Sequence, residues 1–128
     1  MSEAKHNIQE KMAKLDELLA WCYDYERLCV RGTIELQTER HDRAQAYFER
    51  AIQVKPDAPE AYELLGRLYL KRNDAARARD LLENALPGLN GKTSAGIFTS
   101  LSLAYRQLKQ PADSIRVAET GLEKLGQQ

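Results

Sequence analysis

The chain has 128 residues, a length typical of a single domain. Its 19 Lys and Arg residues balance 19 Asp and Glu residues, so the formal net charge is zero. This neutrality argues against a nucleic-acid partner, which calls for clustered basic residues. No run of 18 apolar residues could insert into a membrane, and the N-terminal residues lack the apolar core of a secretory signal. We therefore expect a soluble, cytoplasmic domain.

The predicted elements are all helical. Strong helix formers dominate, and no stretch alternates with the period of two that marks a strand. Pro, Gly and Asn-Asp interruptions mark turns at regular intervals. They predict helices over 5–22, 25–38, 41–54, 59–71, 74–86, 94–108 and 111–126. Gly32 is the only weak point between Ile8 and Leu36, so the first two segments could instead form one long helix.

Several residues suit helix starts. Pro59 fits a first helical position, where its missing N–H costs nothing. Asp74 is a predicted N-cap, as is Thr93 or Ser94 for the next helix. His41 and Asp42 are interpreted as a capping arrangement rather than a catalytic pair.

A unit of 34 residues recurs along the chain. From Pro59, a set of large and small residues is spread over two helices, at Tyr62, Leu65, Gly66, Tyr69, Ala78, Leu82 and Ala85. The same frame 34 residues earlier holds Leu28, Arg31, Gly32, Glu35, Ala44, Phe48 and Ala51. With two extra loop residues it reappears as Phe98, Leu101, Ser102, Tyr105, Ser114, Ala118 and Gly121. Small residues at this spacing suit close helix crossings, which an ordinary helical bundle does not require.

These residues resemble the tetratricopeptide repeat, a 34-residue helix–turn–helix unit. The resemblance covers 25–128, as repeats at 25–58, 59–92 and 95–128. The third repeat departs from the pattern by substituting Ser for Gly and for Ala. The resemblance implies a single all-α domain, a right-handed α-solenoid of antiparallel helix pairs with about seven helices. An N-terminal amphipathic helix at 1–24 precedes the repeats, with Ile8, Met12, Leu15, Leu19 and Cys22 on one side.

In this family the first helix of each repeat lines a concave groove that holds peptides or folded partners. The implied partner-binding residues are Cys29, Thr33, Leu36, Glu63, Arg67, Leu70, Lys71, Thr99, Leu103 and Arg106. They combine an apolar strip with a basic trio, so we expect a short peptide with apolar side chains and an acidic group. Some members of the family hold the acidic tails of chaperones through a clamp of Lys, Asn and Arg. Here Cys29, Thr33 and Ser100 stand at those positions, so we do not expect binding of chaperone tails.

Motifs for catalysis are weak. Gly91 to Thr93 read GKT, but a phosphate-binding loop needs a glycine where Leu86 stands and a strand before it. Cys22 and Cys29 lack the spacing and partners of metal ligands and are interpreted as structural thiols. We expect no enzyme, no metal and no cofactor.

The aromatic cluster of Trp21, Tyr23 and Tyr25 has two interpretations. Such residues anchor partners at interface hot spots. The interpretation we favour is a hydrophobic bridge from the N-terminal helix onto the first repeat.

The sequence thus predicts a non-catalytic adaptor or chaperone-like module that binds a peptide or protein partner. The alternative is a self-assembly protein that oligomerises through its N-terminal helix and its uncapped last helix. On that last helix Ile115, Ala118, Leu122 and Leu125 form a stripe that is partly open. We expect homo-oligomerisation, with the N-terminal helix capping the first repeat in its own chain or in another subunit.

Overall fold

The computed structural model describes residues 2–89, 91–92 and 94–126, without the side chains of 2–4 and 19–22. These residues form six α-helices and no strand, which confirms the all-α prediction. The helices are α1 (Ser2–Gln37), α2 (His41–Val54), α3 (Pro59–Lys71), α4 (Ala75–Ala85), α5 (Ala95–Gln107) and α6 (Pro111–Gly126), with a 3-10 turn, η1 (Leu86–Leu89), after α4. The described part of the chain has six helices rather than seven because 5–22 and 25–38 belong to one continuous helix.

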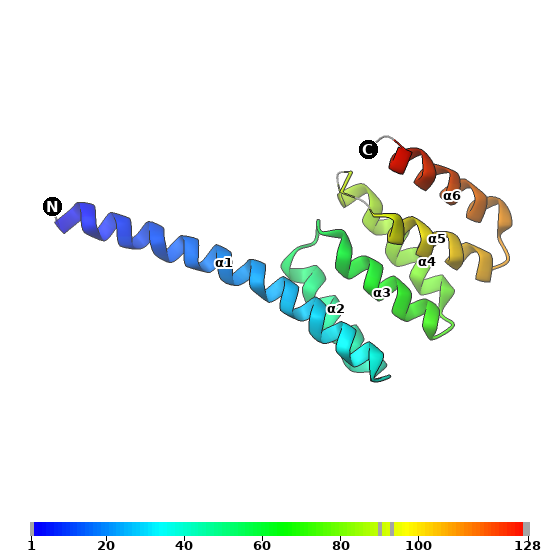
Figure 1. Ribbon diagram of the computed structural model, residues 1–128, viewed down its shortest axis with the longest axis horizontal. Helices are drawn as coiled ribbons and strands as arrows, with labels where there is room; N and C mark the ends of the chain where they lie inside the picture. Colours follow the sequence, from blue (N-terminus) through cyan, green and yellow to red (C-terminus); the bar gives the residue numbers. More distant parts are fainter. Residues whose placement is uncertain (1, 90, 93, 127–128) are drawn as a thin grey trace.

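The helices stack as antiparallel pairs (Figure 1). The C-terminal part of α1 packs on α2, α3 packs on α4, and α5 packs on α6. Each pair lies beside the next, with α3 in contact with α1, α2 and α5, so the chain forms an α-solenoid. The N-terminal part of α1 projects away from the stack.

Gly32 does not break α1, because its missing side chain serves packing. A Cβ at Gly32 would overlap the ring of Phe48, which is fully buried on α2. In the second pair a Cβ at Gly66 would lie 3.1 Å from Leu82 Cδ1. A glycine on the first helix therefore lets a large side chain of the second helix approach its backbone.

The third pair also has a close helix crossing, but different residues form it. Here the glycine is on the second helix, where a Cβ at Gly121 would lie 2.7 Å from Phe98 Cβ. The two serines that depart from the repeat pattern bond to each other. The Ser102 and Ser114 Oγ atoms lie 2.9 Å apart, and each is also 2.9 Å from the other residue's carbonyl oxygen. This pairing satisfies the polar groups that the substitutions introduce.

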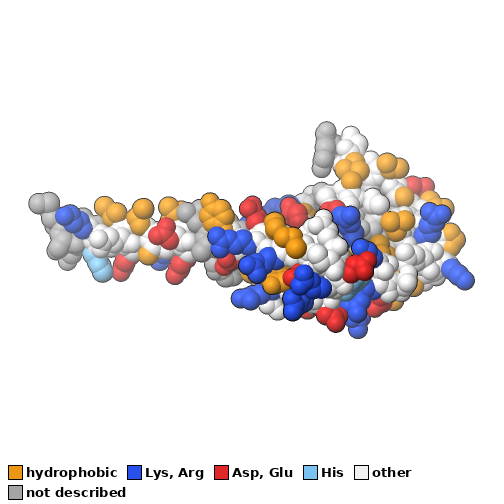
Figure 2. Space-filling view, turned by 60° about the horizontal axis from the view of Figure 1, so that its bottom comes forward, with side chains coloured by type: hydrophobic (Ala, Val, Ile, Leu, Met, Phe, Trp, Pro, Cys, Tyr) orange, Lys and Arg blue, Asp and Glu red, His pale blue; other side chains and the backbone are white. Residues whose placement is uncertain are grey.

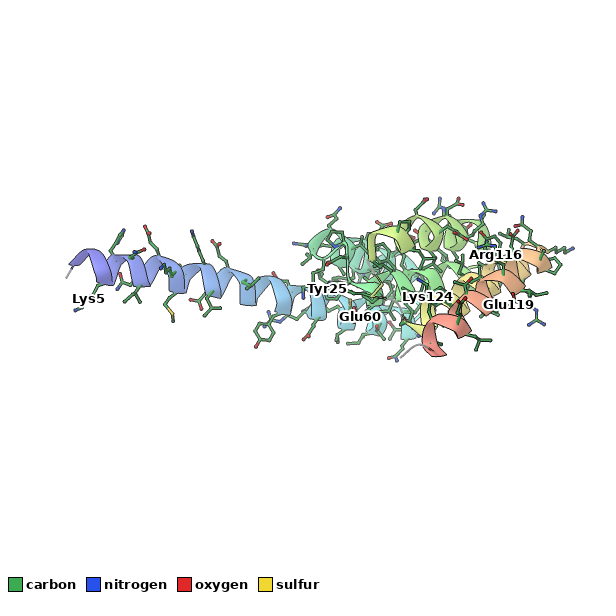
Figure 3. The ribbon with its side chains drawn as sticks, turned by 90° about the horizontal axis from the view of Figure 1, so that it is seen from above. Lys5, Tyr25, Glu60, Arg116, Glu119 and Lys124 are labelled. Carbon is green, nitrogen blue, oxygen red and sulfur yellow. The ribbon has the colours of Figure 1, made fainter. Side chains whose placement is uncertain are left out.

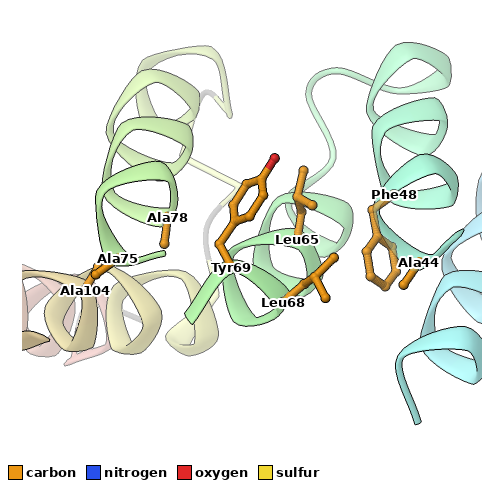
Figure 4. Close-up of a cluster of buried hydrophobic side chains, with 8 residues drawn as sticks. All are labelled: Ala44, Phe48, Leu65, Leu68, Tyr69, Ala75, Ala78 and Ala104. Atoms are coloured by element: carbon orange, nitrogen blue, oxygen red, sulfur yellow. The ribbon is translucent and has the colours of Figure 1, made fainter. Parts of the chain in front are cut away.

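The core runs from one pair to the next. Figure 4 shows a buried cluster that draws side chains from α2, α3, α4 and α5. Its members are Ala44, Phe48, Leu65, Leu68, Tyr69, Ala75, Ala78 and Ala104. Leu65, Leu68 and Tyr69 of α3 join the buried side chains of α2 to those of α4 and α5. The stacked pairs therefore have one continuous hydrophobic core.

Each pair turns through a residue in the left-handed region. Glu39, Asn73 and Lys109 have φ values of 62°, 60° and 61°. The next residue's N–H donates back into the first helix, from Arg40 to Glu35 O (2.8 Å) and in the same way at the other two turns. A left-handed residue closing a helix in this way is common, and it is normally glycine or asparagine.

Two predicted helix starts differ in outcome. Asp74 caps α4, since its Oδ1 accepts the Arg77 N–H at 3.3 Å. The predicted capping by His41 and Asp42 is wrong. Arg40 occupies the N-cap of α2 without a side-chain bond, and Asp42 instead pairs with Arg72 of the next helix pair at 3.1 Å.

We expect Gly32→Ala to lower the free energy of unfolding by about 1–3 kcal/mol, because the added methyl group overpacks the α1–α2 crossing. Chemical denaturation measures the loss. Gly88→Ala is the control, since a Cβ there meets nothing within 4 Å. Adding Phe48→Leu to Gly32→Ala should cost less than the sum of the two single changes. Strict additivity would contradict the close crossing.

We expect Lys109→Gly to raise the free energy of unfolding by roughly 0.5–1 kcal/mol, because glycine adopts positive φ without the penalty that Lys incurs. Asn73→Gly should gain less, since asparagine tolerates this conformation. Denaturation midpoints compare the two variants. Equal gains would show that the turn is not strained at Lys109.

Candidate functional site

The sequence-predicted groove residues lie on the three first helices, α1, α3 and α5, which are neighbours in the stack. The three basic residues, Arg67, Lys71 and Arg106, are exposed. The apolar strip is less accessible than expected. Leu36 and Leu70 pack partly against the core cluster, and Cys29 packs beside buried Tyr25, whereas Leu103 is 41% exposed.

The polar members of the predicted groove make hydrogen bonds within the chain. Ser94 Oγ donates to Glu63 Oε2 at 2.9 Å, which joins the start of α5 to α3. Thr33 Oγ1 donates to the Cys29 carbonyl, and Thr99 Oγ1 donates to the Ala95 carbonyl, both at 2.8 Å. Because these polar side chains already bond within the chain, the exposed cations Arg67, Lys71 and Arg106 are the groups of the predicted groove most available to a ligand. Ser100, at the clamp position, is only 3% exposed.

Tyr25 joins the first two helix pairs. Its hydroxyl accepts the Ala61 N–H and donates to Glu60 Oε2, both at 3.1 Å (Figure 3). Burial raises the pKa of this phenol above its ordinary value, so the hydroxyl keeps the proton that it donates to Glu60. Tyr25 thus links the first pair to the second, which differs from the predicted bridge between the N-terminal helix and the first repeat. Tyr23 is 58% exposed and takes no part in it, and the Trp21 side chain lies outside the described residues.

An open hollow of about 740 Å³ lies at this junction. Its lining includes Tyr25, Cys29, Lys55, Asp57, Glu60 and Lys92. Lys92 pairs with Asp57 at 3.2 Å and holds the pKa of that carboxyl below its usual value. Burial raises the pKa of the Cys29 thiol, which disfavours the thiolate that a nucleophile needs. Sequence reasoning missed this hollow because two loops from different repeats form one side of it.

A second hollow, of about 320 Å³, lies between α5 and α6 and is mainly apolar. It is lined by Phe98, Thr99, Leu103, Gly121, Leu122, Leu125 and their neighbours. The predicted stripe on the last helix is largely open, since Ile115 is 58% and Leu122 is 71% exposed. Val117 and Gly121 make the buried contact instead. One repeat earlier Leu89, which corresponds to Leu125, is fully buried.

The described residues offer neither a metal site nor a membrane-spanning helix. Among them, no three His, Cys, Asp or Glu side chains lie close enough together to hold a metal ion. None of the described helices combines the length and apolarity needed to cross a bilayer. Cys29 is a free thiol, and the Cys22 side chain lies outside the described residues.

Comparisons with known proteins agree with the stacked pairs. Tetratricopeptide repeat protein 5 of Mus musculus is 25% identical over 134 residues, which cover 93% of this chain and 30% of that protein. The fold is similar to that of MamA, with a TM-score of 0.70 at 20% identity over 80% of this chain and 59% of the other. It is also similar to YrrB, a TPR protein with an unusual peptide-binding site, with a TM-score of 0.64 at 22% identity over 75% and 48% of the chains.

The chain therefore spans less than a third of the mouse relative's length. A family model described as the tetratricopeptide repeat matches residues 29–92, which is half of the chain. The match includes both glycines that sit at helix crossings, Gly32 and Gly66. Sequence, fold and helix packing agree that this chain belongs to the tetratricopeptide repeat family.

Proposed function

We propose that the chain is a non-catalytic adaptor or chaperone-like module that binds a peptide segment along α1, α3 and α5. The tetratricopeptide fold is a protein-interaction fold, and in this chain the partner lies along the first helices of the pairs. The partner segment carries an acidic group flanked by apolar side chains.

Three exposed cations without an ion-pair partner among the described residues carry this proposal. Arg67 and Lys71 on α3 and Arg106 on neighbouring α5 are exposed. Within the described part of the chain none of the three forms an ion pair, whereas Arg72, Arg77 and Arg116 on the same helix pairs all do. Unpaired guanidinium and ammonium groups on a shared surface favour a carboxylate from outside the chain.

The apolar part of the partner would be bound beside these cations. Leu103 is exposed next to them on α5 and also lines the apolar hollow of the last pair. The similar fold of YrrB, whose structure is described as having a peptide-binding site, supports a peptide as the ligand. A cytoplasmic location remains a prediction.

A second candidate function is self-assembly. It is favoured by exposed apolar side chains at both ends of the stack, such as Met12 on α1 and Leu122 on α6. At α6 this function would share a surface with groove binding, because Leu122 lines the same hollow as Leu103.

Selection from a display library of random linear peptides tests groove binding. Wild-type protein should enrich peptides that combine an acidic residue with apolar neighbours. Arg67→Glu with Lys71→Glu should weaken binding of a selected peptide by about tenfold or more, because like charges then face its acidic group. Arg43→Glu with Arg50→Glu, which makes the same charge change at exposed sites on α2, is the matched control. Failure to enrich any acidic motif, or equal loss in both double variants, would contradict the proposal.

A further inference from the structure

An apolar stripe runs along α1 and contacts little of its own chain. The α1 stripe consists of six described side chains that are each 46–62% exposed: Ile8, Met12, Leu15, Tyr23, Val30 and Ile34. At 3.6 residues per turn they fall within an arc of roughly 100°. Figure 2 shows hydrophobic side chains along one edge of the projecting part of α1. A stripe of this length marks an interaction surface.

The repeat register shows what kind of surface this is. Val30 and Ile34 correspond to Leu64 and Leu68 in the second pair. Leu68 is fully buried, as is Ala104 at the same place in the third pair. In those pairs the preceding pair covers these positions. On α1 the same face is open in the described chain.

The stripe cannot be covered by α1 itself. Ile8 and Ile34 lie on one continuous helix, about 39 Å apart at 1.5 Å per residue. The projecting part of α1 therefore cannot fold back over Val30 and Ile34 without breaking the helix. A second helix has to supply the cover.

We propose that this helix is α1 of a second copy, laid antiparallel along the stripe. The outer spacings of the stripe are the same in both directions, with four residues from Ile8 to Met12 and four from Val30 to Ile34. Ile8 then lies opposite Ile34 of the second copy, and Met12 lies opposite Val30. The projecting part of each copy covers the open face of the other copy's first helix pair, where a preceding repeat would otherwise pack.

Charge sets the antiparallel direction. Glu26 is an exposed residue that falls within the arc of the stripe. A parallel pair would place Glu26 against Glu26 of the second copy, which is a like-charge contact in an apolar seam. The antiparallel pair removes this self-contact and places Glu26 beside Leu15 and level with Asp16 of the second copy. It also brings exposed Asp16 beside Arg27 of the second copy, since both lie on the same flank of the stripe.

The same residue, Arg27, disfavours end-to-end stacking of the solenoid on α6 of another copy. It occupies the position at which Ala61 and Ile97 are fully buried between successive pairs. Continuing the stack across two chains would bury its guanidinium in that contact. The antiparallel pair leaves Arg27 at the edge, opposite a carboxylate.

Sedimentation equilibrium of the chain up to about 100 μM tests the proposal. Wild-type protein should approach a mass of about 29 kDa, twice the 14.6 kDa of one chain. Met12→Lys and Val30→Glu should each weaken dimerisation about tenfold or more. The double variant Met12→Lys/Val30→Glu should recover it, because the introduced lysine of one copy then faces the introduced glutamate of the other. Glu17→Lys, on the opposite face of α1, should leave it unchanged. Circular dichroism checks that every variant stays helical.

Each other outcome overturns the proposal. A wild-type mass of 14.6 kDa throughout would show that α1 does not pair with itself. A dimer that survives both single changes uses another surface. A double variant weaker than both single variants would mean parallel pairing. Species that grow beyond the dimer with concentration would mean end-to-end stacking.

Discussion

The close approach of two helix backbones inside each pair is the constraint on which the rest of the structure depends. Phe48 lies over Gly32, and Leu82 lies over Gly66, so the second helix can sit tightly on the first. In the third pair the small residue at the crossing is Gly121 on the second helix, and the large one is Phe98 on the first helix. Because the crossings are similar, the pairs stack in register and bring α1, α3 and α5 side by side.

The row of first helices, α1, α3 and α5, determines which groups are available for binding. Its polar residues near the pair junctions, such as Glu63 and Thr33, are already hydrogen-bonded within the chain. Tyr25 joins α1 to α3 through its hydroxyl and stays buried. Arg67, Lys71 and Arg106 are exposed on this row, as are Thr99 and Leu103. Arg67, Lys71 and Arg106 lie on α3 and α5, away from the α1 stripe, whereas Cys29 of the predicted groove lines the same hollow as Val30 of the stripe.

Helix packing was largely predictable from the sequence because it depends on residue size at a fixed period. The spacing of Gly32 and Gly66 and the buried alanines of the second helices were enough to give the register. The continuity of α1 was harder to predict, because helix propensity treats Gly32 as a weak point of about 1 kcal/mol. Its contact with Phe48 is a tertiary effect that propensity does not contain.

The details of the site were less predictable. Leu36 and Leu70 carry the same helical spacing whether they face a ligand or the core, and packing of the neighbouring pair decides that they are half-buried. The hollow beside Tyr25 joins Asp57 and Lys92, which only the stacking of two loops brings together. Asp42 fitted a helix cap in sequence, yet its carboxylate pairs with Arg72 of the next pair at 3.1 Å.

Hydrogen exchange of a Leu82→Ala variant tests the central claim most directly. Leu82 is fully buried at the α3–α4 crossing and belongs to a cluster with Ile97, Phe98 and Leu101 of α5. If the crossings hold the solenoid together, the cavity should cost about 2–5 kcal/mol and speed amide exchange in α3, α4 and α5 together. Faster exchange confined to α4, with α3 and α5 protected as before, would contradict the account.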